Sequence, residues 1–324
     1  MSTNRKIEDY PLVTVITVTY NSSAYVRDAI ESILSSSYEN FELIIGDDSS
    51  PDDTWAIIQE YTDRRIVSYR NESNLGEYPN RNKAINLATG KYLIFIDGDD
   101  MIYPHGLEFM VRFLEAFPDC GMALMYPYLN WMYYPAIVTS RDFYVSNFFS
   151  KGFNDLAFAN TLFNTRILKE ASMLPLTYKA GDTYVRLKIA SKYPTLLVQD
   201  QLTWWRETPG QASESVRNTP SAIVENYLLH AEIILDSTNP LSEDERIKAM
   251  QNEMYKMRMI LFSFLKRLKL KSFVLLLSAI FRQGFIFKLL SVGRTYSNPF
   301  AQYSPGQPFR LSNSEPEKYS HVWY

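Results

Sequence analysis

Strand-like and helix-like segments alternate along the first hundred residues. Residues 13–18 are apolar and β-branched, a pattern typical of a strand that is buried on both faces. Apolar side chains then recur at i, i+3, i+4, i+7 and i+8 between Val26 and Leu34, which predicts a helix with one apolar stripe. Residues 41–46, 66–69 and 92–96 predict further strands. Because parallel strands need crossover connections, usually helices, this alternation predicts an α/β fold with a mostly parallel sheet flanked by helices.

Turn and cap residues set the expected ends of the helices. Ser50 and Pro51 suit the N-cap and first turn of a second helix, which we expect to run to about Tyr61. Residues 80–88 predict a third helix, and Gly90 ends it before the next strand. The chain therefore begins as a βαβαβ unit.

Composition divides the chain into three parts. Of the 324 residues, 46% are apolar and 15% aromatic, which is enough to bury a substantial core. The clearest change of composition falls near residues 213–220. We predict an α/β domain over residues 1–215 (halves at about 11–100 and 101–215), a basic helical extension over 216–297, and a loosely ordered tail over 298–324.

The extension carries a large excess of positive over negative charge. Between Arg246 and Arg294 there are eleven Lys or Arg residues against one acidic residue, Glu253, so this segment carries +10 and the rest of the chain −13. The apolar run at 273–281 is too short to span a bilayer. Basic residues around an apolar run favour peripheral contact with an anionic membrane. A helical hairpin packed on the domain and a homodimer interface remain as alternatives.

The only cysteine, Cys120, leaves no partner for an intrachain disulfide, and no apolar segment preceded by positive charge occurs in the first twenty residues. These features favour a cytoplasmic location. Together with the basic extension they predict a protein on the inner face of the cell membrane. No nucleic-acid partner is predicted.

Carboxylates follow two of the predicted strands. Asp97, Gly98, Asp99 and Asp100 come directly after residues 92–96, and Asp47 and Asp48 end the strand of residues 41–46. If the two strands lie close together, both groups face one crevice at the carboxyl edge of the sheet. A cation would relieve their repulsion, and carboxylate oxygens suit Mg²⁺ or Mn²⁺, which bind a substrate's phosphates as well. The alternative is that these aspartates only cap turns or helices.

Five segments occur in a fixed order: VITVTYN at 15–21, ELIIGDDSS at 42–50, NLG at 74–76, NRNKAI at 80–85 and GKYLIFIDGDD at 90–100. In order and spacing they resemble the GT-A nucleotide-sugar glycosyltransferases, and within these the inverting enzymes of family 2. The resemblance covers roughly residues 11–213. It implies a Rossmann-like GT-A sheet, here followed by the C-terminal helical extension.

The resemblance also implies roles for individual residues. The nucleotide sugar is expected to contact ten residues: Thr19, Tyr20, Asn21, Asp47, Asp48, Arg81, Asp97, Gly98, Asp99 and Arg206. Asp47 or Asp48 would contact the base, and Arg81 would lie near the nucleotide or its phosphates. Asp97, Asp99 and Asp100 are the candidate metal ligands, with Asp99 nearest the metal.

A catalytic base is expected further along the chain. Residues 179–187, KAGDTYVRL, resemble the family's acidic motif at the start of an acceptor-side helix. Gly181 stands where glutamate is common, and Asp182 is the candidate base. A helix N-terminus favours the ionised form of a carboxylate, which can then accept a proton. An ordinary N-cap aspartate is the alternative.

The segment Trp204–Trp205–Arg206–Glu207–Thr208 departs from the family pattern in one place. Relatives commonly have histidine where Thr208 stands, so a third contact to pyrophosphate or metal is in question. Arg206 can still neutralise a phosphate.

The predicted function is an inverting glycosyltransferase that uses Mg²⁺ or Mn²⁺. It would move a sugar from a nucleotide-diphosphate sugar, most simply a UDP-sugar, to a hydroxyl of a glycan or lipid-linked glycan acceptor in surface polysaccharide or glycoconjugate assembly. The alternative is a catalytically inactive GT-A-like binding partner of a membrane glycosyltransferase complex.

Overall fold

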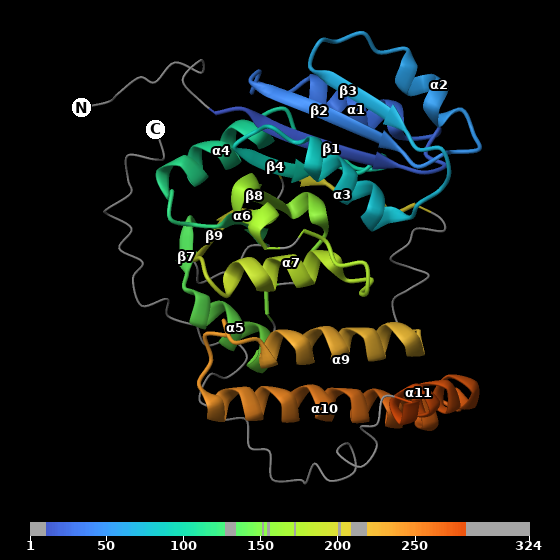
Figure 1. The fold of residues 1–324 in the computed structure, drawn as a ribbon, viewed down its shortest axis with the longest axis vertical. Coiled ribbons are helices and arrows are strands. Elements are labelled where there is room, and N and C mark those ends of the chain that lie inside the picture. Colours follow the sequence, from blue (N-terminus) through green and yellow to red (C-terminus); the bar gives the residue numbers. More distant parts are fainter. Residues whose placement is uncertain are drawn as a thin grey trace.

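The computed structural model describes residues 11–126, 134–150, 152–153, 156–171, 173–199, 202–208 and 219–282. The predicted domain boundary at residue 215 and the predicted tail at 298–324 lie outside the described residues, so both stay predictions. Figure 1 shows that the described residues form a central sheet with helices on both faces and a stack of C-terminal helices at one end.

Eight strands form the central sheet within the described residues: β1 Val13–Thr19, β2 Phe41–Asp47, β3 Ile66–Arg70, β4 Tyr92–Phe95, β6 Met122–Tyr126, β7 Ala136–Val138, β8 Thr161–Asn164 and β9 Thr195–Gln199. Their order is β3-β2-β1-β4-β8-β6-β9-β7. Neighbours β3, β2, β1 and β4 are parallel, as are β6 and β9, whereas β8 and β7 run antiparallel to their neighbours. The predicted mostly parallel sheet is confirmed.

Helices α1 Val26–Leu34 and α3 Glu77–Leu87 lie where the sequence predicts them, but α3 begins at Glu77 rather than at residue 80. Gly76 precedes it with φ of 92°, a conformation that a side chain would disfavour. Pro79 fits the first turn, where its missing N–H is not needed. The earlier start brings Glu77 and Tyr78 into the helix.

The second helix is shorter than predicted: α2 spans Thr54–Gln59 and its N-cap is Asp53, so the predicted cap at Ser50 is wrong. Ser50 is engaged elsewhere, because both its hydroxyl and its backbone N–H donate to the carboxylate of Asp47. Asp52 accepts from Thr54 N (3.1 Å) and from Ser23 N (3.0 Å). The polar residues after β2 therefore tie down the end of the strand before the helix begins.

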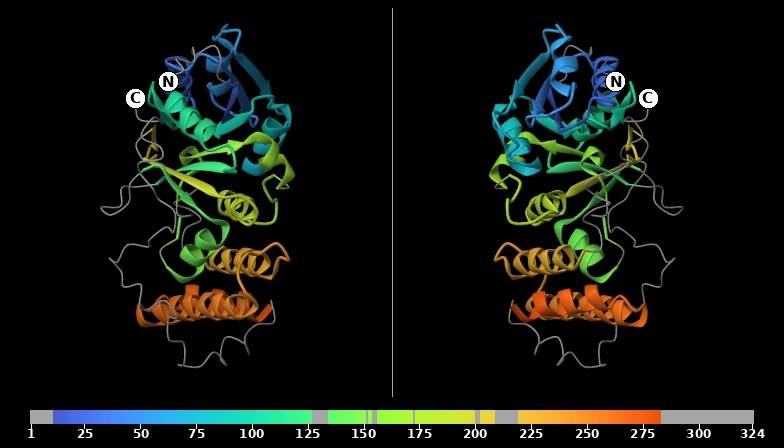
Figure 2. Two further views of the ribbon diagram at one scale, coloured as in Figure 1. Left: turned by 90° about the vertical axis from the view of Figure 1, so that its left-hand side faces the viewer. Right: turned by 90° about the vertical axis from the view of Figure 1, so that its right-hand side faces the viewer.

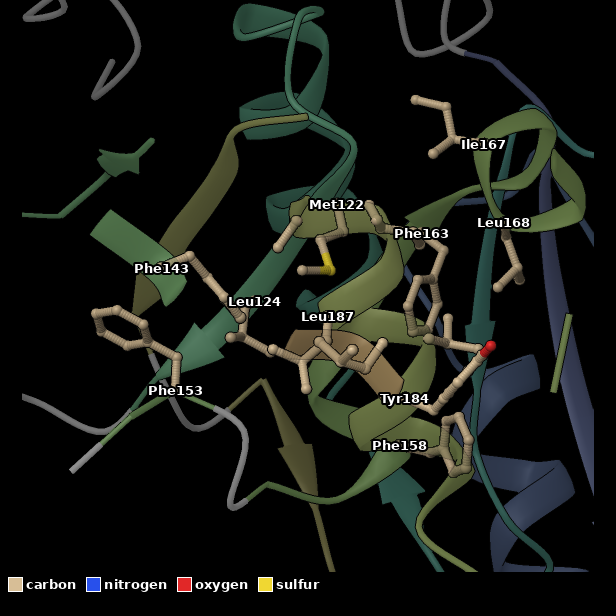
Figure 3. Packing of buried hydrophobic residues seen from close by; sticks show 14 of the residues in the cluster. Met122, Leu124, Phe143, Phe153, Phe158, Phe163, Ile167, Leu168, Tyr184 and Leu187 are labelled. Atoms are coloured by element: carbon tan, nitrogen blue, oxygen red, sulfur yellow. The ribbon is translucent and has the colours of Figure 1, made fainter. Parts of the chain in front are cut away.

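Two apolar clusters fill the two faces of the sheet, since alternate strand residues point to opposite sides. Helices α1, α2 and α4 Gly106–Ala116 contribute to one cluster, and α3, α5 Ser140–Phe149, α6 Thr165–Glu170 and α7 Gly181–Ala190 to the other. Figure 3 shows Tyr184 and Leu187 of α7 among Leu124, Phe158 and Phe163. This packing fixes α7, and the carboxylate in its first turn, against the sheet.

The C-terminal helices are α9 Pro220–Leu235, α10 Glu243–Lys266 and α11 Leu270–Arg282. Helix α10 begins at a capping box made by Ser242 and Glu245. Figure 2 shows α9 and α10 as successive layers, with α9 next to α7. No helix in the described ranges is long and apolar enough to cross a membrane.

A buried charge network joins α9 to α10. Glu253 Oε2 lies 2.7 Å from His230 Nδ1, and Glu253 Oε1 accepts from Lys256 Nζ at 2.6 Å. Burial by itself raises the pKa of Glu253, but the hydrogen bonds and charges of His230 and Lys256 lower it to about 2. The ionised carboxylate therefore stabilises the packing of these helices.

We expect Glu253→Gln to lower the free energy of unfolding at pH 7 by about 1–3 kcal/mol, since charge-assisted hydrogen bonds are lost. The pKa of Glu253 is lowered from 4.5 to about 2, so its contribution is complete above pH 4.5 and lost as the pH falls through 2. Urea unfolding of both proteins across this range measures the difference, which should shrink with falling pH. The control Glu243→Gln, exposed on the same helix, should change stability by less than about 0.5 kcal/mol. A difference that stays constant with pH would contradict the charge assignment.

Candidate functional site

Strands β1, β2 and β4 end at the same edge of the sheet. Thr19 pairs in register with Asp47, and Gly98 N donates to Val18 O at 3.2 Å, so the segment after β4 continues beside β1. Both predicted acidic groups therefore lie at one edge of the sheet, at the ends of the two strands that flank β1. The two acidic groups share this edge, as predicted for strands that lie close together.

Gly98 allows the ends of β1 and β4 to come close. A Cβ at Gly98 would meet Thr19 Cγ2 at 2.7 Å and Ser22 Cβ at 3.4 Å. The first of these distances is too short for any side chain unless Thr19 or the backbone moves. Glycine between Asp97 and Asp99 is therefore a packing requirement of this edge.

Asp47 is fully buried and serves the chain itself. Its Oδ2 accepts from Ser50 N (3.1 Å) and from Arg70 Nε (3.2 Å), and its Oδ1 accepts from Thr19 Oγ1 (3.3 Å). Arg70 also donates to Ser50 O at 2.7 Å. In this geometry Asp47 holds the loop after β2 and offers no exposed surface to a base.

Asp48 organises a second loop. Its Oδ1 accepts from Asn71 Nδ2 (2.8 Å) and Leu75 N (2.9 Å), and its Oδ2 from Gly76 N (2.8 Å). The side chain is buried, but each carboxylate oxygen can accept more than one hydrogen bond. Base contact by Asp48 stays a prediction.

The residues after β1 present an exposed ring at this edge. Tyr20 is 52% exposed. Asn21 takes a φ of 56° and its N–H donates to Ser50 Oγ at 3.0 Å, which fixes the turn. An exposed aromatic ring on a fixed turn suits stacking on a flat ligand group.

Arg81 lies behind the acidic cluster. Its Nη2 donates to Asp97 Oδ2 (2.8 Å) and Glu77 Oε1 (3.0 Å), and its guanidinium lies 4.5 Å from the centre of the Phe158 ring. Burial lowers the pKa of Arg81, but Asp97 and Glu77 raise it well above its ordinary value. Arg81 therefore carries a permanent positive charge beside Asp97. Its predicted contact with phosphates stays a prediction, since the side chain is buried.

Two further carboxylates stand close to Asp97. Burial and the charge of Asp97 raise the pKa of Asp99, and the same causes, with Asp99, raise the pKa of Asp100 to about 8. Asp100 is buried and accepts from Arg206 N at 3.1 Å. A cation at this edge would relieve the repulsion among these three carboxylates.

The segment that contains β10 Thr203–Trp204 folds back onto this edge by pairing with β5 Met101–Ile102. Arg206 Nε donates to Asp99 O (3.0 Å) and its Nη2 to Asp28 Oδ2 (2.8 Å). Thr208 Oγ1 donates to Asp99 Oδ2 at 3.1 Å. Thr208, where relatives commonly have histidine, is thus placed directly on the acidic motif, and Arg206 brings positive charge beside it.

The carboxylates after β4 meet only part of what a divalent cation requires. Within the described residues, no three His, Cys, Asp or Glu side chains form a group that could hold a metal ion, so the set Asp97, Asp99 and Asp100 gains no support. Mg²⁺ and Mn²⁺ need only one or two carboxylates when phosphates supply further oxygens. Asp97 Oδ1 is buried and has no hydrogen-bond partner among the described residues. Asp97 and Asp99 therefore fit such a cation better than Asp100.

The candidate base lies in the first turn of α7, as predicted. Asp182 Oδ2 accepts from Arg186 Nη1 at 3.3 Å, and the Asp182 side chain is 22% exposed. Arg186 is fully buried and donates to Thr161 Oγ1 (2.9 Å) and to Leu156 O (2.9 Å). Burial lowers the pKa of Arg186, while the charge of Asp182 opposes that shift. The buried Arg186 therefore holds Asp182, while the exposed part of Asp182 stays open to a proton donor. The alternative that Asp182 is the N-cap is wrong, because the N-cap is Ala180.

Several residues of the site were not singled out from the sequence. Arg186 carries a usable signal, because it lies four residues after Asp182 in a predicted helix. Arg70 and Tyr78 carry none, because their contacts to Asp47 and Gly181 join distant parts of the chain.

Similar sequences were found among known proteins. The family model described as "Glycosyl transferase family 2" matches residues 14–170. The UDP-Glc:alpha-D-GlcNAc-diphosphoundecaprenol beta-1,3-glucosyltransferase WfaP of Escherichia coli is 35% identical over 139 residues, which cover 43% of this chain and 51% of WfaP. The chain spans about half the length of the curated relatives it matches.

Solved structures share the fold. Residues 1–349 of TarS from S. aureus, in complex with UDP-GlcNAc, match with a TM-score of 0.67 and 21% identity over 90% of this chain and 86% of that chain. The mannosyltransferase PcManGT from Pyrobaculum calidifontis, in complex with GDP-Man and Mn²⁺, matches with a TM-score of 0.56 and 18% identity over 93% of this chain and 83% of that chain. At these identities the likeness bears on the fold, and the predicted GT-A architecture is confirmed.

We expect Gly98→Ala to destabilise the protein by about 1–3 kcal/mol, because the new methyl group overlaps Thr19 Cγ2. The double variant Thr19→Ser/Gly98→Ala removes that methyl group and keeps the hydroxyl that donates to Asp47, so it should recover most of the loss. Urea unfolding of the single and double variants measures both effects. Equal destabilisation with and without Thr19→Ser would contradict the packing explanation.

Proposed function

Since residues 14–170 match the model of glycosyl transferase family 2, we propose that this protein transfers a sugar from a nucleotide-diphosphate sugar to a hydroxyl of a glycan or lipid-linked glycan acceptor. The reaction proceeds with inversion at the anomeric carbon. The observation that carries the proposal is the crowding of Asp97, Asp99 and Asp100 at the end of β4, beside the exposed ring of Tyr20. This edge combines a site for a phosphate-bound cation with a surface for a nucleotide.

The proposed donor is a UDP-sugar. The name of WfaP contains a UDP-glucose donor, and TarS was solved with UDP-GlcNAc, which supports this nucleotide class for the present chain. Tyr20 would stack on the base, and Asp48 would accept a hydrogen bond from the N3–H of uracil. Arg206 would lie near the diphosphate, where its fixed charge favours binding.

The proposed metal ligands are Asp97 and Asp99. The buried, unpartnered Asp97 Oδ1 supports this choice, and the Mn²⁺ in the PcManGT complex supports a divalent cation. When bound, Mg²⁺ or Mn²⁺ supplies positive charge that stabilises the departing diphosphate. Thr208 orients Asp99 through its hydroxyl, and Arg81 orients Asp97 by donating to its Oδ2.

Asp182 is the proposed base. It accepts the proton of the acceptor hydroxyl as that oxygen attacks the anomeric carbon from the face opposite the leaving nucleotide. The ion pair with Arg186 holds the carboxylate in one orientation, and the start of α7 lies against α3 of the donor half. Both features favour a short path between acceptor and donor.

The proposed acceptor is a lipid-linked glycan. The name of WfaP includes a diphosphoundecaprenol-linked acceptor, which supports this class and a role in polysaccharide assembly. The alternative, an inactive binding partner of a membrane transferase complex, gains no support from the relatives, which are named as glycosyltransferases.

The C-terminal helices supply the proposed membrane contact. Helices α9, α10 and α11 pack around one apolar cluster, so part of the extension is a packed helical unit. The opposite faces stay exposed: Phe262 is 55% and Leu268 82% exposed, and further exposed apolar residues are Met259, Leu265, Leu270, Val274 and Leu275. Lys266, Arg267, Lys269 and Lys271 lie between them. Exposed apolar groups among cations fit the surface of an anionic membrane at its inner face.

The donor site is tested by calorimetric titration with UDP, GDP and dTDP, each with and without Mn²⁺. Asp99→Asn should remove the metal-dependent part of the affinity, about tenfold or more, because a ligand charge is lost. Asp182→Asn should leave nucleotide affinity within about twofold and lower kcat by about 10²–10⁴, because only proton transfer is impaired.

Asp119→Asn, which changes an exposed carboxylate after α4, is the matched control and should alter neither quantity. If no nucleotide binds to the unmodified protein, the proposal is overturned in favour of the inactive binding partner. Unchanged turnover in Asp99→Asn would remove the metal assignment alone.

Membrane contact is tested by co-sedimentation with vesicles of phosphatidylglycerol and phosphatidylcholine. The variant Phe262→Asp/Leu268→Asp should bind at least about tenfold more weakly, because two inserted apolar groups are replaced by charges that the lipid repels. Binding of the unmodified protein should fall when salt rises from about 0.1 M to about 1 M.

Val67→Asp, at an exposed apolar position on β3, is the control and should bind vesicles as the unmodified protein does. If the double variant binds vesicles normally but changes from dimer to monomer in sedimentation, the exposed face joins two copies of the chain and the membrane assignment is wrong.

A further inference from the structure

Tyr78 joins the first turn of α3 to the start of α7. Its hydroxyl donates to Lys179 O and accepts a hydrogen bond from Gly181 N at 2.8 Å. These two groups stand on either side of Ala180, the residue before the helix. Burial and the charges of Glu77 and Asp182 raise the pKa of Tyr78, so the phenol stays protonated and able to donate at neutral pH.

The ring of Tyr78 also occupies the space beside Gly181. A Cβ at Gly181 would meet Tyr78 Cζ at 2.9 Å and Cε2 at 3.0 Å. Any side chain at this position would push away either the ring or the start of α7. This contact gives a steric reason for glycine where the related motif commonly has glutamate.

Hydrogen bonds connect α3, the helix that carries Tyr78, to both acidic groups at the sheet edge. Gly76, just before α3, donates its N–H to Asp48 Oδ2 at 2.8 Å. Arg81, one turn after Tyr78, donates to Asp97 Oδ2 at 2.8 Å. A shift of α3 would therefore disturb both acidic groups at the sheet edge.

The same helix is tied to the chain that leads into α7. The side chain of Asn82 donates to Leu174 O (2.9 Å) and accepts from Leu174 N (3.0 Å). With the two bonds of Tyr78, α3 holds the segment before α7 at two separated points. The start of α7 is thus held from outside as well as by its own packing on the sheet.

We propose that Tyr78 is the positioning residue of Asp182: it holds the backbone from Lys179 to Gly181 against α3, and glycine at 181 is what admits its ring. The inference rests on the proposed function, because it takes Asp182 as the base. Gly181 is the neighbour of Asp182, so the placement of its backbone sets the placement of the carboxylate. Tyr78 itself touches neither donor nor acceptor and acts only through this backbone.

The test uses the full chain and begins with Tyr78→Phe, which removes the hydroxyl and keeps the ring. Amide hydrogen exchange of residues 179–182 should accelerate at least about tenfold, whereas α4 should not change. The kcat should fall about 10- to 100-fold with KM for the donor and UDP affinity within about twofold, because a displaced base slows the chemical step alone. Tyr61→Phe, which removes an exposed hydrogen bond to Glu31, is the matched control and should change none of these.

A second pair of variants tests the steric part. Gly181→Ala should lower kcat at least about tenfold when Tyr78 is present. In the Tyr78→Ala background the same change should cost less than about twofold, because the space is then open. A role in overall stability alone would give additive effects and no split between kcat and KM.

Unchanged exchange and kcat in Tyr78→Phe would overturn the proposal, as would full activity of Gly181→Ala. If the unmodified protein transfers no sugar, the proposed function fails and with it the role of Asp182 as base. Hydrogen exchange then still decides separately whether Tyr78 holds the start of α7.

Discussion

Repulsion among carboxylates at one edge of the sheet is the constraint on which the rest of the site depends. Three parallel strands end together, and Asp47, Asp48 and Asp100 are buried at this edge. Three arginines offset part of this negative charge. Arg81 pairs with Asp97, Arg70 pairs with Asp47, and Arg206 donates to the backbone oxygen of Asp99. These cations neutralise part of the charge, and the remaining excess makes the edge a good place for a cation and a phosphate-bearing ligand.

The aspartates at this edge differ in how far their oxygens are already hydrogen-bonded within the protein. Asp47 and Asp48 use their oxygens to organise the loops after β2, and Asp100 is turned towards the backbone of Arg206. Within the described residues, Asp97 keeps a buried oxygen without a hydrogen-bond partner, and the side chain of Asp99 accepts a hydrogen bond from the hydroxyl of Thr208. The division separates aspartates that shape the site from those that are placed to bind within it.

The second half of the molecule is coupled to this edge by packing. Tyr184 and Leu187 hold α7 on the sheet, Tyr78 holds its first turn, and the buried Arg186 orients Asp182. On the outer side, α9 contacts α7 and leads to α10 and α11, whose exposed faces carry apolar and basic residues. Packed helices therefore connect the proposed base on α7 to the exposed faces of α10 and α11.

The sequence alone determined the strand and helix alternation, the acidic strand ends and the candidate base, because each depends on local patterns: β-branched runs, 3.6-residue periodicity and motifs of fixed spacing. It misjudged the start of α2, since the hydroxyl of Ser50 is drawn to Asp47 instead of capping a helix. Only the tertiary structure decided which aspartates are already engaged, why glycine stands at positions 98 and 181, and that Tyr78 meets the start of α7. Those facts depend on contacts between residues far apart in the chain, whose distances local spacing does not encode.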